Sequence, residues 1–430
     1  MTRVLQITPY PTRHPAHGGQ FRAHHTARIL EAAGHTVDRM GVFRHSEFST
    51  AGEAPIVDLD RAQIERRFPS VWQVANLTNN ELAATDNGCY LAFANRVRAS
   101  RPDILMLEEP WLWPAVRRWR GDFSPTLPVI YNAYNIEYRA KAAMLTDAKV
   151  PAAAAIVGEV KALERGLMQS ADAVSATTAE DAAVIEAWIG KKVAVARNGT
   201  VLRHVEHLCG VLPAPLEPWH RFLLFVGSAY PPNATGFWDI VIPALSALRS
   251  NQRIVVAGSV SHLVQSRADW LDRCHMGRDR LVILGQVSEL ALSCLLGNAT
   301  GIILPITYGG GSNLKTAEAL ASGLPIVGTS MAFRGFGEYA CWPNVTIADE
   351  PAAFAAGIRG LFDASSVKPA VQVPKELLWD STLQPILSLV EAMADLSGDE
   401  SGSALRGADA NSTLAKLSVG WSGGDTDLTG

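Results

Sequence analysis

Short apolar runs alternate with helix-length segments along most of the chain. The first run covers residues 4–7, and Gly18-Gly19, a helical segment over 20–33 and a strand-like segment over 35–42 follow it. Further strand-like runs occur at residues 104–107, 129–131, 173–176, 193–196, 222–227, 254–258, 281–285, 301–305 and 324–328. A strand, a loop, a helix and another strand in this order form a βαβ unit with parallel strands. The alternation therefore predicts an α/β chain built on parallel sheets.

A proline-rich segment divides these runs into two series. Residues 209–218 contain three prolines, which is typical of a linker. We therefore expect one sheet-based unit over 1–208 and a second over 219–378. Residues 379–396 carry apolar side chains at helical spacing, whereas the composition of 397–430 shifts to Gly, Ser, Ala, Asp and Thr and predicts a disordered tail.

The composition narrows the class of protein. Of the 430 residues 48% are hydrophobic, which suits large cores, and the net charge of −4 argues against a general nucleic-acid binder. No apolar run is long enough to span a membrane, and no signal peptide is expected. The five cysteines lack zinc-site spacing, and their odd number predicts reduced thiols. We therefore expect a cytoplasmic protein without a metal site.

A glycine-rich segment carries the strongest chemical signal. Three glycines follow the strand-like run at 301–305, and a helix is expected to begin near Ser312 and end at Gly323. Glycine backbone and a helix N-terminus offer free N–H groups to an anion. Lys315 adds a positive charge in the first turn, and Glu318 lies on the same helical face. This order predicts a diphosphate at the glycines and a ribose at Glu318; the alternative is a glycine loop with a surface Lys–Glu pair.

Several motifs together resemble one known family, the GT-B glycosyltransferases, in particular the large retaining family 4. The resemblance covers about residues 3–390, and each motif is short. The motifs are Gly309-Gly310-Gly311-Ser312-Asn313-Leu314-Lys315, Glu318-Ala319, Gly323-Leu324-Pro325-Ile326-Val327, Phe225-Val226-Gly227-Ser228, Tyr230-Pro231-Pro232-Asn233, Asn135-Ile136-Glu137, Asp172-Ala173-Val174-Ser175-Ala176 and Asn198-Gly199-Thr200.

The resemblance implies two Rossmann-like domains that face a cleft, with the last helix crossing back to the N-terminal domain. It implies transfer of a sugar from a UDP- or GDP-sugar to a hydroxyl acceptor, which could be a glycan, a lipid-linked glycan or a small molecule. It also implies retention of configuration, no metal and no further cofactor. Peripheral contact with the inner face of the membrane would suit such an enzyme.

The resemblance also assigns roles to residues. Lys315 would neutralise the departing diphosphate, and Glu318 would hold the ribose. The remaining donor-side candidates are Gly18, Gly19, Gly227, Ser228, Asn233, Val287, Gly309, Gly310, Gly311, Ser312, Asn313 and Leu314. The acceptor-side candidates are His24, Tyr134, Asn135 and Glu137.

The chain departs from the family pattern at three places. Gly310 stands where many members have a glutamate that contacts the transferred sugar, so backbone groups become the expected sugar contacts. The segment 227–230 lacks the usual basic residue, and Tyr134 stands where the family has a histidine. Two alternatives stay open: a nucleotide-sugar 2-epimerase, which shares the two-domain architecture, and a non-catalytic sugar-nucleotide-binding subunit, which the changes at Gly310 and Tyr134 favour.

Two further patterns have competing interpretations. Asp58-Leu59-Asp60 resembles a metal-binding pair of carboxylates, although no strand ends beside it and chance is the favoured interpretation. Trp111 and Trp113 precede a group of arginines and could form a membrane-surface patch. Because they closely follow a predicted strand, we expect them to pack in the core.

Overall fold

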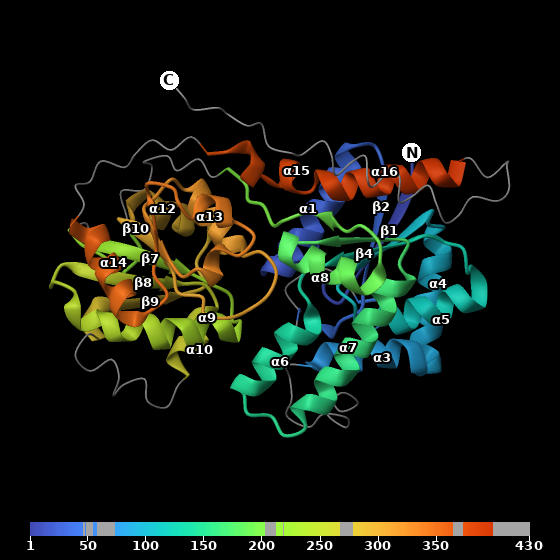
Figure 1. Cartoon of the computed structure of the whole chain (residues 1–430), viewed down its shortest axis with the longest axis horizontal. Coiled ribbons are helices and arrows are strands. Elements are labelled where there is room, and N and C mark those ends of the chain that lie inside the picture. Colours follow the sequence, from blue (N-terminus) through green and yellow to red (C-terminus); the bar gives the residue numbers. More distant parts are fainter. Residues whose placement is uncertain are drawn as a thin grey trace.

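The computed structural model describes residues 1–45, 48, 55–57, 74–202, 212–217, 219–266, 278–363 and 373–398. Two six-stranded sheets, each wrapped by helices, lie side by side (Figure 1). The two-sheet α/β prediction is therefore confirmed. The Asp58–Asp60 pattern and the part of the predicted tail after residue 398 lie outside the described residues.

The N-terminal sheet has the strand order β2-β1-β3-β4-β5-β6, and all neighbouring strands are parallel. Its strands are β1 (Arg3–Thr8), β2 (Thr36–Gly41), β3 (Ile104–Glu108), β4 (Val129–Ala133), β5 (Ala173–Ala176) and β6 (Ala194–Val195). Both faces of the sheet are covered, which explains why the strands read as continuous apolar runs.

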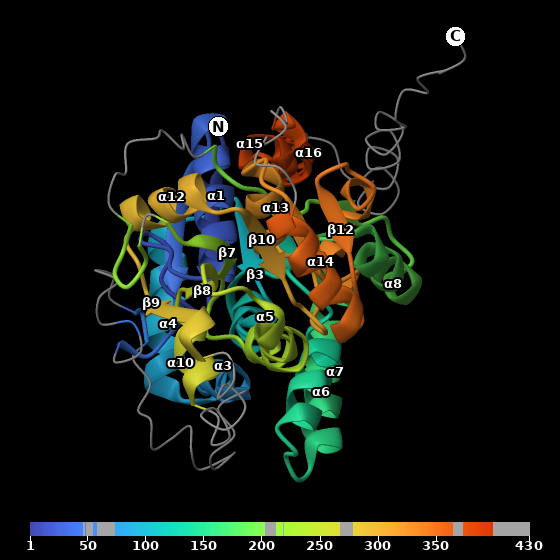
Figure 2. The same ribbon diagram turned by 90° about the vertical axis from the view of Figure 1, so that its left-hand side faces the viewer.

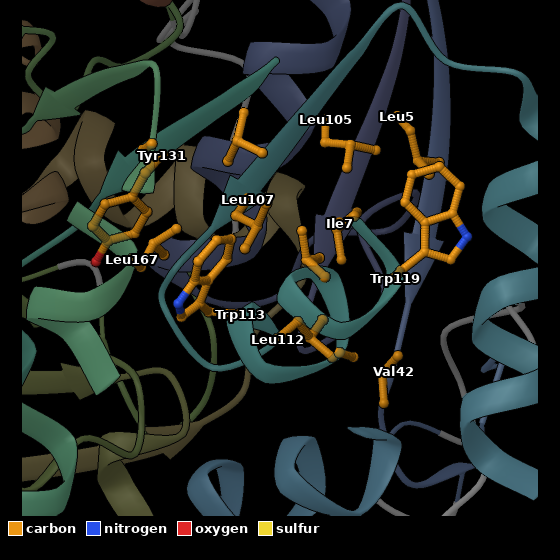
Figure 3. Close-up of a cluster of buried hydrophobic side chains, with 14 of the residues drawn as sticks. Leu5, Ile7, Val42, Leu105, Leu107, Leu112, Trp113, Trp119, Tyr131 and Leu167 are labelled. Carbon is orange, nitrogen blue, oxygen red and sulfur yellow. The ribbon is translucent and has the colours of Figure 1, made fainter. Parts of the chain in front are cut away.

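One face of this sheet packs against a helical layer in the cluster shown in Figure 3. Leu105 and Leu107 of β3 belong to this cluster together with Trp113 and Trp119 of α5, and both tryptophans are buried. Trp111 is buried in a neighbouring cluster, so the core interpretation of the tryptophans is confirmed. The helices of this face include α3 (Ala75–Thr85), α4 (Asn87–Ser100), α5 (Trp113–Phe123), α7 (Ala153–Ser170) and α8 (Ala179–Ile189).

The other face of the N-terminal sheet is covered by helices from opposite ends of the chain. Alternate residues of β3, Ile104 and Met106, face α1 (Gly18–Ala32) and the last helix, α16 (Gln384–Gly398). Trp379 of α15 (Trp379–Thr382) belongs to the same apolar cluster. The chain thus crosses back over its first sheet after the second one is complete, as Figure 1 shows.

The C-terminal sheet has the order β12-β11-β10-β7-β8-β9, again with parallel neighbours. Its strands are β7 (Arg221–Val226), β8 (Gln252–Ala257), β9 (Leu281–Gly285), β10 (Gly301–Leu304), β11 (Ile326–Gly328) and β12 (Val345–Ile347). The helices around it include α9 (Pro231–Gly236), α10 (Val260–Gln265), α12 (Glu289–Asn298), α13 (Leu314–Ala321) and α14 (Pro351–Asp363). Helices α12 and α13 cover one face, while α14 covers the other (Figure 2).

Two smaller expectations needed correction. Helix α13 begins at Leu314 rather than near Ser312, because Asn313 still has the extended backbone of an N-cap. Cys294 is disulfide-bonded, so the expectation of reduced thiols is wrong for this residue, although Cys89 and Cys341 are free. Within the described residues, we find no helix whose length and hydropathy would let it cross a membrane.

Candidate active site

The two domains meet where strands of both sheets reach their carboxyl ends. The loop after β10 carries Gly310, Gly311 and Ser312, and it lies against Tyr134 and Asn135, which follow β4. We call the contacts between residues 134–135, 177 and 198 on one side and 310–312 on the other the domain junction. Ligands of open α/β sheets bind at this end of the strands.

Gly311 allows the closest approach at the domain junction. Its φ is +64°, and a Cβ atom there would lie 2.2 Å from the carbonyl oxygen of Tyr134. A Cβ atom on Gly310 would lie 3.1 Å from Oδ1 of Asn135. Only glycine combines the left-handed backbone with the missing Cβ that position 311 requires.

Ser312 joins the loop to the N-terminal domain through hydrogen bonds. Its backbone N–H donates to Oγ1 of Thr177 at 3.1 Å. Its Oγ accepts from the backbone N–H of Asn198 at 2.8 Å, and its carbonyl oxygen accepts from Nδ2 of Asn198 at 2.7 Å. The serine side chain is therefore committed to the domain junction.

Lys315 and Glu318 line a cavity of about 200 Å³ beside the domain junction. Burial lowers the pKa of Lys315 to about 8, and the nearby Glu318 carboxylate opposes this shift. The cavity is smaller than the usual few hundred Å³ of ligand pockets. The other lining residues are mostly apolar: Thr200, Val201, Val226, Leu292, Leu296, Ile302, Leu304, Ala319, Ala321 and Ser322.

The structure thus separates two parts of the sequence motif. Lys315 and Glu318 share the cavity as expected, whereas Gly310 and Gly311 face the N-terminal domain instead of the cavity. Gly309 has a φ of +143°, and a Cβ atom there would meet nothing within 4 Å. An anion at the helix N-terminus would therefore lie between the cavity and the domain junction.

Three other donor-side candidates of the C-terminal domain, Gly227, Ser228 and Asn233, follow strand β7. Asn233 donates from Nδ2 to the carbonyl oxygen of Ser228 at 2.8 Å, and a Cβ on Gly227 would lie 3.5 Å from the same Nδ2. These three residues therefore lie together at the end of β7.

Three more donor-side candidates make contacts within the fold. Val287 and Leu314 pack against apolar clusters. Nδ2 of Asn313 donates to the carbonyl oxygens of Met331 and Ala332. The side chain of Asn313 is thus used to position the start of α13.

Of the N-terminal candidates, Gly19 lies close to polar side chains and His24 does not face the junction residues. A Cβ on Gly19 would lie 2.5 Å from Tyr10 Oη and 3.3 Å from Oε1 of Glu109, while one on Gly18 would meet nothing within 4 Å. Nδ1 of His24 lies 2.9 Å from the carbonyl oxygen of Thr12, and burial lowers the pKa of His24.

Tyr134 belongs to a buried polar network that the sequence did not predict. Its hydroxyl donates to Oε2 of Glu108 at 2.9 Å. Nε2 of Gln6 donates to Oε1 of Glu108 at 2.7 Å, and Nδ2 of Asn132 donates to both oxygens at 3.1 Å. Burial raises the pKa of Glu108, while these donors and the charge of Arg22 oppose the rise.

A second group of carboxylates lies beside this network. Glu109 follows β3 with a φ of +68°, and it accepts hydrogen bonds from Tyr10 and from Nε1 of Trp111. Burial, with a further contribution from Glu137, raises the pKa of Glu109 to about 8. Across the junction, the pKa of Tyr230 is raised by burial and by the charges of Glu137 and Glu109.

Glu137 is the first residue of α6 (Glu137–Asp147), and it accepts a hydrogen bond from Nδ2 of Asn135 at 2.8 Å. Its backbone N–H donates to the buried Glu164 at 2.7 Å. Burial and the charge of Glu137 raise the pKa of Glu164 to about 8. Asn135 and Glu137 therefore do lie together, at the side of the junction that faces Tyr230.

No group of three or more His, Cys, Asp and Glu residues in the described part of the chain is arranged to hold a metal ion. Lys315 supplies a positive charge beside the cavity. A helix N-terminus contributes further partial charge there.

Comparison with known proteins identifies the C-terminal domain. Residues 220–364 match the family model described as Glycosyl transferases group 1. No curated protein sequence matches the chain.

Similar solved structures cover nearly the whole chain. α,α-Trehalose 6-phosphate synthase from Burkholderia multivorans has a TM-score of 0.61 at 12% identity, and the match covers 94% of this chain and 99% of that one. WaaG, a glycosyltransferase involved in lipopolysaccharide biosynthesis, has a TM-score of 0.57 at 16% identity, and the match covers 98% of this chain and 100% of that one. A putative UDP-N-acetylglucosamine 2-epimerase from Listeria monocytogenes has a TM-score of 0.56 at 13% identity, and the match covers 92% of this chain and 98% of that one. At these identities the likeness shows the fold. The whole chain therefore has the two-domain GT-B architecture, and its residues 220–364 match a group 1 glycosyl transferase domain.

Proposed function

We propose that the protein transfers a sugar from a nucleoside-diphosphate sugar to a hydroxyl acceptor, with retention of configuration and without a metal. The observation that carries the proposal is the shared cavity of Lys315 and Glu318 beside the N-terminus of α13. The cavity adjoins the carboxyl ends of β7 and β10, which is where nucleotides bind in this class of fold.

Lys315 is proposed to neutralise the diphosphate as it leaves. A developing phosphate charge is stabilised by a positioned cation and by free N–H groups at a helix N-terminus. A pKa of about 8 keeps the Lys315 ammonium mostly protonated at neutral pH, and a bound diphosphate would raise it further. This charge also supports the proposal that no metal is needed.

Glu318 is proposed to hold the ribose. It lies one turn after Lys315 on α13, and both residues line the cavity. An ionised carboxylate accepts two hydrogen bonds from vicinal hydroxyls but repels phosphate. We therefore expect the nucleoside to lie deeper in the cavity than the diphosphate.

The proposal is tested by incubating the protein with a panel of UDP- and GDP-sugars and measuring release of the nucleoside diphosphate, with EDTA in a parallel series. We expect slow hydrolysis of one donor, unchanged by EDTA and lost in Lys315→Ala. Glu318→Gln should raise KM more than it lowers kcat. A matched control is Lys192→Ala, because this side chain is exposed and pairs with Glu186, away from the cavity. If wild type and Lys315→Ala release nucleoside diphosphate equally, the assignment of Lys315 is wrong.

The same panel separates the two alternatives. An epimerase would return a nucleotide sugar with inverted C2, which NMR detects without added acceptor. A non-catalytic subunit would bind donor and release nothing. Once an acceptor is found, the anomeric configuration of the product tests retention.

A further inference from the structure

Arg22 is a buried cation that the proposed roles do not use. It lies on α1, in the helix turn that follows Gly18 and Gly19, and only 1% of its surface is exposed. Nη1 donates to Oδ1 of Asn198 at 3.3 Å, whereas Nε and Nη2 are buried and find no hydrogen-bond partner among the described residues. Its Cζ lies 5.3 Å from the centre of the Tyr134 ring.

Burial without partners is costly for a guanidinium. Buried charged groups are normally paired and hydrogen-bonded. Leaving a buried charged donor without a hydrogen bond costs more free energy than leaving a neutral donor without one. Glu108 is close enough to influence Arg22 electrostatically. However, hydrogen bonds from Gln6, Asn132 and Tyr134 occupy its oxygens. Two nitrogen atoms of Arg22, Nε and Nη2, thus remain for another acceptor.

The position of Arg22 indicates what that acceptor is. Asn198 bonds both to Arg22 and to Ser312, so the guanidinium is one residue away from the loop that leads into α13. The segment after β7 provides no cation, because residues 227–230 are Gly, Ser, Ala and Tyr.

We propose that Arg22 is an anion-binding residue of the N-terminal domain, and that Nε and Nη2 bind a phosphate oxygen of the nucleoside diphosphate. This inference rests on the proposed function. It supplies, from the opposite domain, the second cation that the segment after β7 lacks. Because Nε and Nη2 are shielded from solvent, the anion enters while the domain junction is open and is then held between Arg22 and α13.

The test is isothermal titration of the full chain with UDP, GDP and the two nucleosides without phosphate. Charge-assisted hydrogen bonds are each worth enough to predict a roughly 10- to 100-fold weaker diphosphate affinity in Arg22→Gln. Nucleoside affinity should not change, because the base and ribose do not reach Arg22. Arg22→Lys keeps the charge but loses the planar fork, so it should bind the diphosphate with intermediate affinity. Arg28→Gln, on the exposed face of the same helix, is the matched control and should bind like wild type.

The outcomes separate this inference from the proposed function. If wild type binds neither UDP nor GDP, the proposed function fails and the inference with it. If wild type binds and Arg22→Gln binds equally well, only the inference is overturned. An equal loss for nucleoside and diphosphate would show that Arg22 is merely structural, and it also overturns the inference. Should Arg22→Gln not fold, judged by circular dichroism, Arg22→Lys decides: affinity equal to wild type contradicts the proposal.

Discussion

Replacing Gly311 by alanine should open the domain junction without unfolding either domain. The new Cβ would lie 2.2 Å from the carbonyl oxygen of Tyr134, and real Cβ contacts stay beyond 3.0 Å. Because a backbone carbonyl cannot rotate away like a side chain, the loop itself must move. A movement of about 0.8 Å would stretch the bond from Ser312 to Thr177 to about 3.9 Å, beyond hydrogen-bond range.

The expected magnitude follows from the bonds that this movement breaks. Ser312 takes part in three hydrogen bonds across the domain junction. At about 1 kcal/mol each, their loss disfavours the joined arrangement by about 3 kcal/mol. Every 1.4 kcal/mol is about tenfold, so the ratio of joined to open protein should fall roughly 100-fold.

Backbone strain must be separated from this effect, and Gly190 provides the control. Its φ of +67° matches the +64° of Gly311, but a Cβ there would meet nothing within 4 Å. Alanine in the left-handed region costs about 1–2 kcal/mol at either position. Both variants should therefore unfold a few degrees below wild type, whereas only Gly311→Ala should lose activity.

The assay is donor hydrolysis, with small-angle X-ray scattering to follow the separation of the domains. We expect Gly311→Ala to lower kcat/KM by up to roughly 100-fold and to increase the radius of gyration, and Gly190→Ala to do neither. Equal activity in the two alanine variants would refute the reasoning, since it would show that the domain junction tolerates a Cβ at position 311.

Two further predictions concern pH. Lys315 has its pKa lowered to about 8, so the folded protein carries this charge below pH 8 and loses it above. UDP or GDP affinity should accordingly fall as the pH rises through 8, and Lys315→Arg should remove this decline; titrations between pH 6.5 and 9.5 measure it. Glu164 has its pKa raised from 4.5 to about 8, so between these values the folded state holds a proton that the unfolded state releases. The free energy of unfolding should fall with rising pH in this window, by up to about 1.4 kcal/mol per pH unit. In Glu164→Gln the free energy of unfolding should fall less with rising pH, and urea denaturation at pH 5, 6, 7 and 8 measures it. The same dependence on pH in wild type and variant would contradict this prediction.

The sheets were predictable because their strands are buried on both faces. Leu223 and Phe225 of β7 face one apolar cluster while Phe222 and Leu224 face the other, so the strand reads as an unbroken apolar run. The same logic placed Trp113 in the core, since α5 must cover β3. These signals are local, and a single sequence contains them.

The geometry of the site was less predictable because it depends on distant contacts. Helical spacing alone placed Lys315 and Glu318 together. The contact of Gly311 with Tyr134 depends on how the domains meet, and no spacing encodes it. Glu108 and Arg22 are ordinary residues in the sequence, and only burial and missing partners distinguish them. The Gly18-Gly19 pair before Arg22 was the sequence feature that could have drawn attention to this part of the N-terminal domain.

The division of the site between domains has a consequence for the order of events. Lys315 and Glu318 belong to a cavity whose walls are mostly from the C-terminal domain, so a nucleoside can bind there while the domain junction is open. Arg22 reaches Ser312 only through Asn198, and that link exists only when the junction is formed. A diphosphate held from both sides would therefore favour the joined arrangement by its own binding energy. Variants that open the junction should keep nucleoside affinity and lose turnover, whereas variants of Lys315 should lose both diphosphate affinity and turnover with the junction intact.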